Sequence, residues 1–113
     1  MEERTLFDWL DSYEYRMGHL EMLEHYVFDI PNDINSINGD GDTPLIYACM
    51  THPQDRPPLD AQLQTVQAII TAGGNVNAVN NNHETALWKA TSDGNFQLVR
   101  LLLKMEQLLI YLI

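Results

Sequence analysis

An internal duplication constrains the fold of this 113-residue chain more than any other feature of its sequence. Residues 33–38, Asp-Ile-Asn-Ser-Ile-Asn, recur 42 positions later as residues 75–80, Asn-Val-Asn-Ala-Val-Asn. The same offset relates residues 43–48, Thr-Pro-Leu-Ile-Tyr-Ala, to residues 85–90, Thr-Ala-Leu-Trp-Lys-Ala. Because two separate blocks keep one offset, the sequence indicates a repeated structural unit, and such units bury their apolar faces by stacking on one another.

Each copy contains the signals of a short helix followed by a longer one. Thr43 is placed to cap the first helix with its hydroxyl, and Pro44 occupies the first helical position, where its missing N–H leaves no hydrogen bond unmade. Ala48 and Ala90 lack bulk at the point where two antiparallel helices must approach closely. The glycine pair at residues 73–74 predicts the end of the longer helix in the first copy.

The motif Thr-Pro-Leu-x-x-Ala, followed by a turn, an apolar helix and Ala-Gly-x-x-Val-Asn-Ala, resembles the ankyrin repeat. The resemblance covers roughly residues 18–104 and implies an all-α ankyrin-repeat solenoid, in which helix-turn-helix units stack and short β-hairpin-like loops join them. Ankyrin units are about 33 residues long, so the longer offset predicts about nine extra residues. Comparison of the two copies places this insertion between the helices of the first one, near residues 50–61.

The resemblance implies a single domain over residues 1–113, with two full repeats at residues 33–74 and 75–104. We expect residues 4–30 to form an N-terminal pair of capping helices. Apolar residues recur at helical spacing from Thr5 to Met17, and Asp8 is placed to complete a capping box with Thr5. Residues 105–113 form an apolar C-terminal tail.

Helical spacing also predicts which side of each longer helix faces the core. Ile46 and Trp88 occupy equivalent positions in the short helices, where the family usually has histidine, and both are interpreted as packing residues. The expected core residues of the longer helices are Leu63, Val66, Ile69 and Ile70 in the first repeat, and Phe96, Val99, Leu102 and Leu103 in the second.

The charge of the chain is strongly negative and unevenly distributed. Six Lys and Arg stand against sixteen Asp and Glu, for a formal net charge of −10. Residues 1–42 hold eleven acidic and two basic residues (net −9), whereas residues 43–113 hold five and four (net −1). This balance argues against a nucleic-acid partner, whose backbone requires a basic footprint, and favours a protein partner with a basic surface.

The cellular location is predicted from what the sequence contains. Cys49 is the single cysteine, so no disulfide can form within the chain, and a reducing cytoplasm is the expected location. No basic segment followed by an apolar stretch opens the chain, so a secretory signal is not expected. The longest apolar run, from Leu108 to Ile113, is six residues against the roughly 20 that a membrane-spanning helix needs, and we expect no membrane association.

Three interpretations of the apolar tail remain open. It continues as a helix that folds over the end of the stack, or it forms a self-association surface, giving a homodimer through Leu108 to Ile113. In the third interpretation these residues pack on further repeats.

Ankyrin proteins bind partners along the hairpin tips and inner helices, and the resemblance implies binding residues there. The Pro-rich insertion is a further candidate because its extra residues must project into solvent, and the alternative is a tolerated loop whose prolines limit its flexibility. The candidate partner-binding residues are Gly39, Asp40, Asp42, Asp55, Arg56, Asn81, Asn82, Glu84, Ser92 and Asp93. Alternatively, the Asp and Asn residues at the tips are turn formers whose side chains bond the nearby backbone. His83 stands where the family usually has glycine, either as a tolerated turn residue or as an added contact.

Catalytic motifs such as HEXXH, GxSxG, GxxxxGKS and GxGxxG do not occur. The acidic stretch at residues 38–42 does not fit a calcium loop, because Cys49 stands where a bidentate glutamate is required. We therefore expect no enzymatic activity, no cofactor and no metal site. The predicted function is a protein-binding adaptor or scaffold module, and the alternative is an acidic inhibitor or immunity-type protein that occludes a basic enzyme.

Overall fold

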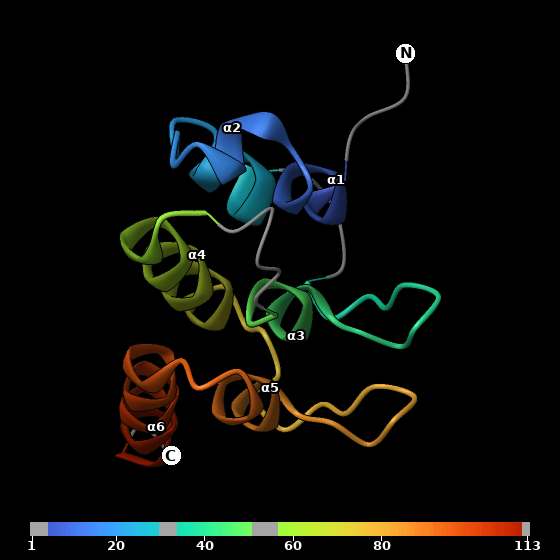
Figure 1. Ribbon diagram of the computed structural model, residues 1–113, viewed down its shortest axis with the longest axis vertical. Coiled ribbons are helices and arrows are strands. Elements are labelled where there is room, and N and C mark those ends of the chain that lie inside the picture. Colours follow the sequence, from blue (N-terminus) through green and yellow to red (C-terminus); the bar gives the residue numbers. More distant parts are fainter. Residues whose placement is uncertain (1–4, 30–33, 51–56, 112–113) are drawn as a thin grey trace.

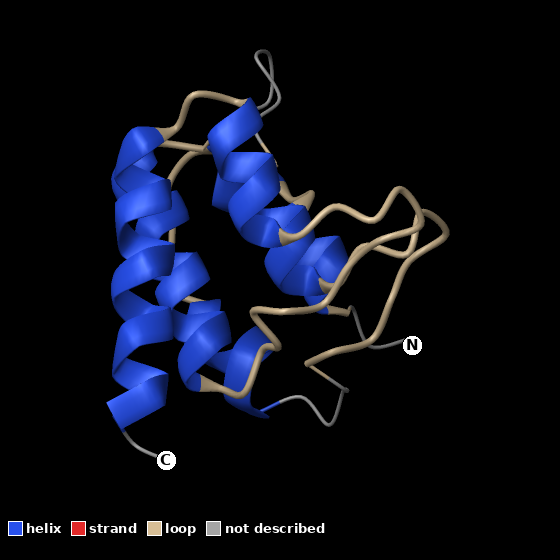
Figure 2. Cartoon of the chain, turned by 90° about the horizontal axis from the view of Figure 1, so that it is seen from below, coloured by secondary structure: helices blue, strands red, loops and turns tan. Residues whose placement is uncertain are grey.

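The computed structural model describes residues 5–29, 34–50 and 57–111, with side chains as far as residue 107. The elements in chain order are α1 (Leu6–Leu10), α2 (Tyr13–Arg16), the π-helical turn η1 (His25–Asp29), α3 (Pro44–Ala48), α4 (Leu59–Thr71), α5 (Ala86–Ser92) and α6 (Phe96–Tyr111). The described residues contain helices and loops but no strand (Figure 2). The expected all-α class is confirmed.

The helices stack in two columns (Figure 1). The short helices α1, α3 and α5 contact one another in that order, while α4 packs on α6 beside them. Within each unit the short helix packs on the long one, α3 on α4 and α5 on α6. The loops that precede α3 and α5 project from the same side of the stack, and we call them finger 1 (residues 34–42) and finger 2 (residues 76–84).

The duplicated threonines start the short helices in the same way. Thr43 Oγ1 accepts a hydrogen bond from the N–H of Ile46 at 3.2 Å, and Pro44 follows it at the first helical position. Thr85 Oγ1 accepts from the N–H of Trp88 at 3.1 Å. Each side chain satisfies one of the N–H groups that the first turn of a helix leaves unbonded, so both fingers end at a fixed point of the stack.

The N-terminal segment is divided more finely than the helical spacing from Thr5 to Met17 predicts. Thr5 and Asp8 form the expected capping box at α1. Ser12 then interrupts the helix, because its hydroxyl donates to the carbonyl of Trp9 at 2.6 Å and accepts from the N–H of Tyr15 at 3.2 Å. A side chain that bonds the end of α1 and also caps α2 replaces one continuous helix by two short ones.

The core lies between the two columns of helices and is continuous along the stack. Ala48 and Ala90 are buried at 4% and 0% exposure, where α3 and α5 approach the neighbouring helices. The largest fully buried apolar side chains are Trp9, Leu6, Leu45, Ile46, Ile69, Leu98 and Val66.

Three residues predicted to be in the core are exposed. Phe96 is 78% exposed and Leu103 is 50% exposed, while Leu98 and Leu102 supply the buried side of α6. Apolar residues stand at nearly every position from Phe96 to Leu103, so their spacing does not determine which side faces inward; packing on α4 and α5 does. Trp88 is also 51% exposed, whereas Ile46 at the equivalent position of α3 is fully buried, because α3 lies between α1 and α5 and no described short helix covers the other side of α5.

Several expectations fall outside the described residues. Asp55 and Arg56 belong to residues 51–56 of the insertion, after which α4 begins at Leu59. The backbone of α6 continues as a helix to Tyr111, but the side chains from Leu108 to Ile113 are outside the described part of the chain. Of the helices described, none has the length and apolar character needed to cross a membrane.

Candidate partner-binding surface

An asparagine side chain closes each finger at the same position. In finger 1, Asn38 Oδ1 accepts hydrogen bonds from the N–H of Asp40 at 2.9 Å and of Asp42 at 3.0 Å. In finger 2, Asn80 Oδ1 makes the equivalent bonds, at 2.9 and 3.0 Å, to the N–H groups two and four residues further on. The duplication therefore extends to the turn chemistry, and one side chain holds each tip in shape.

The residue that follows the tip has a left-handed backbone in both fingers. Gly41 has a φ of 77°, and His83 at the equivalent position has a φ of 63°. A side chain at Gly41 would collide with finger 2, because its Cβ would lie 2.8 Å from the backbone nitrogen of Asn81. His83 lies on the outer side of finger 2 and is exposed, so its side chain meets no such neighbour among the described residues.

Hydrogen bonds join the two fingers side by side. Asn81 donates from its backbone N–H to the carbonyl of Asp40 at 3.1 Å, and from Nδ2 to the carbonyl of Gly39 at 3.3 Å. Closer to the helices, Asn80 Nδ2 donates to Asp42 Oδ1 at 2.9 Å. The two tips therefore form one surface rather than two independent loops.

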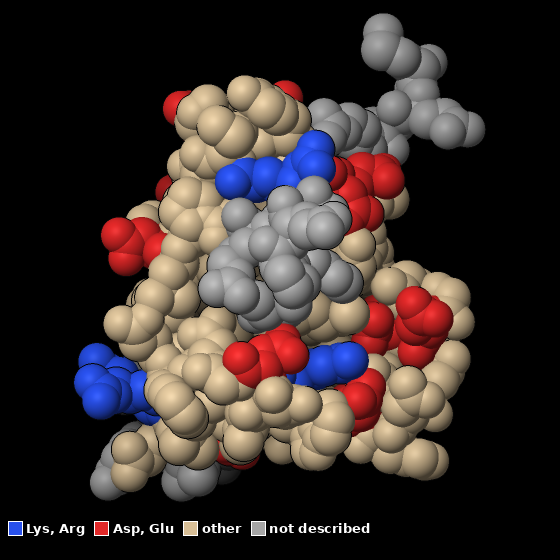
Figure 3. Space-filling view, viewed as in Figure 1, with Lys and Arg blue, Asp and Glu red and all other residues tan. Residues whose placement is uncertain are grey.

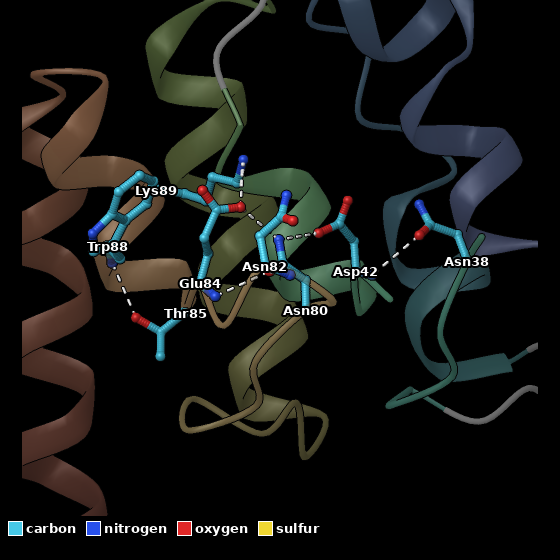
Figure 4. Close-up of polar contacts among 8 residues, drawn as sticks. All are labelled: Asn38, Asp42, Asn80, Asn82, Glu84, Thr85, Trp88 and Lys89. Atoms are coloured by element: carbon cyan, nitrogen blue, oxygen red, sulfur yellow. Dashed lines mark hydrogen bonds and ion pairs between the residues drawn. The ribbon is translucent and has the colours of Figure 1, made fainter. Parts of the chain in front are cut away.

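A further chain of polar contacts connects the fingers to α5 (Figure 4). Asn80 Nδ2 also donates to Glu84 Oε1 at 2.8 Å, and Lys89 Nζ lies 3.1 Å from the same oxygen. The hydrogen bond from Asn80, followed by the contact with Lys89, holds the pKa of Glu84 below its usual value. Glu84 is consequently charged at neutral pH and ties finger 2 to the helix behind it.

Asn35 connects the two repeats at the base of the fingers. Its Nδ2 donates to the carbonyl of Gly73 at 3.2 Å, and its Oδ1 accepts from the N–H of Asn75 at 2.7 Å. Asn77 occupies the equivalent position in finger 2, where its side chain is exposed and bonds to none of the described residues. The same residue type thus joins two units in one copy and faces solvent in the other.

The predicted binding residues at the finger tips lie together. Gly39, Asp40, Asn81 and Asn82 are all exposed, and the bonds from Asn81 hold the two tips in contact. The structure contradicts the prediction that Asp42 contacts a partner. Its side chain is only 3% exposed and accepts the hydrogen bond from Asn80, so it supports the fingers and is not available to a partner.

The other predicted binding residues lie elsewhere. Glu84 is half-buried and paired with Lys89. Ser92 and Asp93 are exposed at the far end of α5, about 10 Å from finger 2 by the rise of a seven-residue helix. They do not join the surface that the tips form.

Two exposed apolar residues of the fingers were not among the predicted binding residues. Ile37 is 66% exposed and Val79 is 50% exposed, at equivalent positions of fingers 1 and 2. The signal was present in the duplicated blocks, since both keep a β-branched residue immediately before the asparagine that closes the turn. We use the name finger surface for Ile37, Asp40, Val79 and Asn81.

Acidic side chains surround this surface. Figure 3 shows acidic groups gathered over the fingers and again over the N-terminal helices, while basic groups lie over the N-terminal helices, near α5 and at the edge of the molecule over α6. The finger surface therefore combines apolar side chains with a negative surround, a combination that suits a partner of opposite charge.

Two ionisable side chains at the end of α3 have structural contacts. Burial raises the pKa of the Cys49 thiol, so it is not a ready thiolate. Burial and a hydrogen bond donated to Asp11 raise the pKa of Tyr47 to about 12. Within the described ranges, no group of three or more His, Cys, Asp or Glu side chains is placed to hold a metal ion.

Comparison with known proteins agrees with the repeated architecture. A family model described as ankyrin repeats (3 copies) matches residues 13–107. A protein of Rattus norvegicus named ankyrin repeat and SAM domain-containing protein 6 is 34% identical over 89 residues, which are 78% of this chain and 9% of the relative. The protein of the same name from Mus musculus is 32% identical over 92 residues, 80% of this chain and 9% of the relative. The chain thus spans a small part of the length of these curated relatives.

Proposed function

Because this chain belongs to the ankyrin-repeat family, whose members are in general protein–protein interaction modules, we propose that it is an adaptor or scaffold module that binds a protein partner with a basic surface. The partner contacts the finger surface, the adjacent exposed side of α5 and the Pro-rich insertion. The two curated relatives carry ankyrin repeats and a SAM domain in their names, and this chain matches only a small share of their length.

The observation that carries the proposal is the cross-bonded pair of fingers. Asn81 holds the tips together and Asn80 joins both fingers to each other and to Glu84, so a partner meets a surface that is already ordered. Preorganisation of this kind reduces the conformational entropy lost on binding. Two equivalent apolar side chains, Ile37 and Val79, then stand exposed on this ordered support.

Charge supports the choice of a basic partner. The exposed carboxylate of Asp40 lies at the tip beside the apolar pair, and the chain as a whole carries a net charge of −10. A negative field of this strength accelerates the approach of a basic partner, and the apolar contacts then slow its release.

A synthetic peptide rich in lysine and leucine serves as the probe of this surface. When it is added to the full chain, we expect NMR chemical-shift changes at Ile37, Val79 and Asn81, and binding that weakens with salt. Ile37→Ser combined with Val79→Ser should weaken binding at least about tenfold. Phe96→Ser, which changes an exposed apolar residue on α6, should leave the binding unchanged. Shifts confined to the N-terminal helices would contradict the proposal.

An acidic inhibitor, the alternative function, would also bind a basic partner, but it would change the activity of that partner. An inhibitor would abolish the activity of a basic enzyme at a 1:1 ratio, whereas an adaptor would bind its partner without blocking it.

Self-association through Leu108 to Ile113 is a separate proposal. Light scattering of the full chain over a hundredfold concentration range would reveal it as a mass that rises with concentration.

A further inference from the structure

The three N-terminal elements are held to one another by an aromatic cluster. The ring of Trp9 on α1 lies 4.8 Å, centroid to centroid, from that of Tyr15 on α2 and 6.2 Å from that of Tyr26 on η1. All three side chains are buried. Because each ring comes from a different element, α1, α2 and η1 form one N-terminal unit, which lies at the end of the stack and packs on α3 (Figure 1).

The contact between the N-terminal unit and the first repeat, here called the N-terminal joint, buries polar atoms that lack a partner. The hydroxyls of Tyr15 on α2 and Thr65 on α4 form no hydrogen bond with the residues that the structure describes, and protein atoms enclose them too closely for a water molecule to reach them. Burial raises the pKa of Tyr15, and smaller effects of Cys49 and Thr65 place both side chains beside it. The two hydroxyls therefore lie together without hydrogen-bond geometry, which makes this joint weaker than its apolar contacts alone would make it.

The joint between the two repeats pairs its buried polar groups instead. Gln62 on α4 is buried, and its Nε2 donates to the carbonyl of Ala48 at 3.0 Å. Its Oε1 accepts from Asn95 Nδ2 of the second repeat, also at 3.0 Å. Asp42 likewise accepts its hydrogen bond from Asn80 across the same joint. Of the two joints, the N-terminal one is therefore expected to part more easily.

Charge weakens the N-terminal joint further. Residues 5–29 contain six acidic residues and one arginine, so the N-terminal unit carries about half of the net charge of −10. The remainder of the chain carries the other half, and like charges on the two sides of a joint repel each other.

We propose that the N-terminal unit opens away from the first repeat while both repeats stay folded, and that this opening uncovers Cys49. The cysteine follows α3, is completely buried and lies beside Tyr15. When Tyr15 leaves the joint, its hydroxyl and that of Thr65 both gain water as a partner, which offsets part of the apolar contact that is lost. The finger surface lies outside this joint, so the opening does not depend on the proposed function.

The single cysteine serves as the probe of this opening. A thiol reagent that gives a coloured product is added to the full chain at low concentration, where the labelling rate follows the population of the open form. The rate is measured in increasing urea below the unfolding transition. Opening of one unit exposes less surface than global unfolding, so we expect the rate to depend less steeply on urea than the unfolding constant measured by circular dichroism.

Removal of the unpaired hydroxyls should hold the joint closed. Tyr15→Phe combined with Thr65→Val keeps the shape of both side chains, and we expect it to slow the labelling of Cys49 at least about tenfold. Tyr13→Phe combined with Thr71→Val is the matched control, because it makes the same chemical changes at exposed positions of α2 and α4. Labelling of the control should stay within about twofold of the wild-type rate.

Labelling that shows the urea dependence of global unfolding would overturn the proposal, because the N-terminal unit would then not open on its own. A double variant at Tyr15 and Thr65 that labels as fast as the wild type, or that fails to fold, would show that the two hydroxyls stabilise the joint. Equal slowing in the control would assign the effect to loss of hydroxyls in general and would also contradict the proposal.

Discussion

Equivalent residues of the two repeats have different structural surroundings, and the differences can be measured at single positions. Asn35 bonds Gly73 and Asn75, while Asn77 at the same position faces solvent. Gly41 of finger 1 lies against Asn81 of the neighbouring finger, while His83 at the same position of finger 2 is exposed. Each pair supplies its own internal control, because the local sequence is similar and only the neighbour changes.

Asn35→Ala should lower the free energy of unfolding by about 1–3 kcal/mol, because it removes one hydrogen bond to Gly73 of the same repeat and one to Asn75 of the next, and leaves the N–H of Asn75 without its partner. Asn77→Ala, the matched control, should change it by less than about 0.5 kcal/mol. Urea denaturation of both variants measures the difference. Equal effects would show that the bonds of Asn35 do not hold the repeats together.

His83→Gly should raise the free energy of unfolding by about 0.5–1 kcal/mol. A left-handed backbone costs a residue other than glycine about 1–2 kcal/mol, and the greater freedom of glycine in the unfolded chain offsets part of that gain. The reverse change in finger 1, Gly41→Ala, should destabilise the fold by more than about 1 kcal/mol, since the added Cβ meets the backbone of Asn81. Urea midpoints of the two variants should therefore move in opposite directions.

At the scale of helices, the short elements depend on close packing around small residues. Ala90 is completely buried on α5, which packs between α3 and α6. Ala90→Leu inserts three carbon atoms at this contact, and overpacking typically costs 1–3 kcal/mol, roughly the margin of a stack this small. We expect the variant to lose its cooperative thermal transition in circular dichroism. Thr91→Leu adds similar bulk at the neighbouring exposed position and should melt near the wild-type temperature.

The sequence predicted helices better than it predicted which way they face. Thr43 and Thr85 mark the starts of α3 and α5 through capping chemistry that acts within one turn, so local sequence was sufficient. The prediction that Phe96 and Leu103 face the core was wrong, because a nearly continuous apolar segment has no unique inward side until its neighbours are placed.

Part of the candidate surface was likewise predictable. The tips at Asp40 and Asn81 followed from the resemblance, whereas the burial of Asp42 depends on a bond from a residue 38 positions away, which no local pattern reveals. Ser12 is a further example: its spacing fits one helix, and only the contacts of its hydroxyl divide α1 from α2.

For the whole molecule, the network around Glu84 predicts sensitivity to acid. The pKa of Glu84 is lower in the folded state than its ordinary value of 4.5, so the folded state binds fewer protons than the unfolded state near this pH. The stabilisation is therefore complete above the unfolded pKa and is lost as pH falls through the folded pKa. Unfolding free energies of the wild type should fall more steeply below pH 5 than those of Glu84→Gln. Parallel curves for the two proteins would remove Glu84 as the cause.

The molecule also has an uneven distribution of charge: acidic groups gather over the fingers, basic groups lie at the edge over α6, and both kinds lie over the N-terminal helices. Such a distribution gives the stack a polarity that its repeated backbone lacks. A partner is thus oriented by charge before any side chain makes contact.

The glycine at position 41 sets a rule for anyone who wishes to lengthen this protein by design. Finger 1 accepts a neighbour because nothing projects from its left-handed turn, and the backbone of Asn81 occupies the space where a Cβ would be. A third finger copied from the second would bring the same backbone nitrogen against His83. Adding another repeat to the stack therefore requires the substitution His83→Gly. Without it, the added finger could not pack against finger 2, and the last two repeats would separate there.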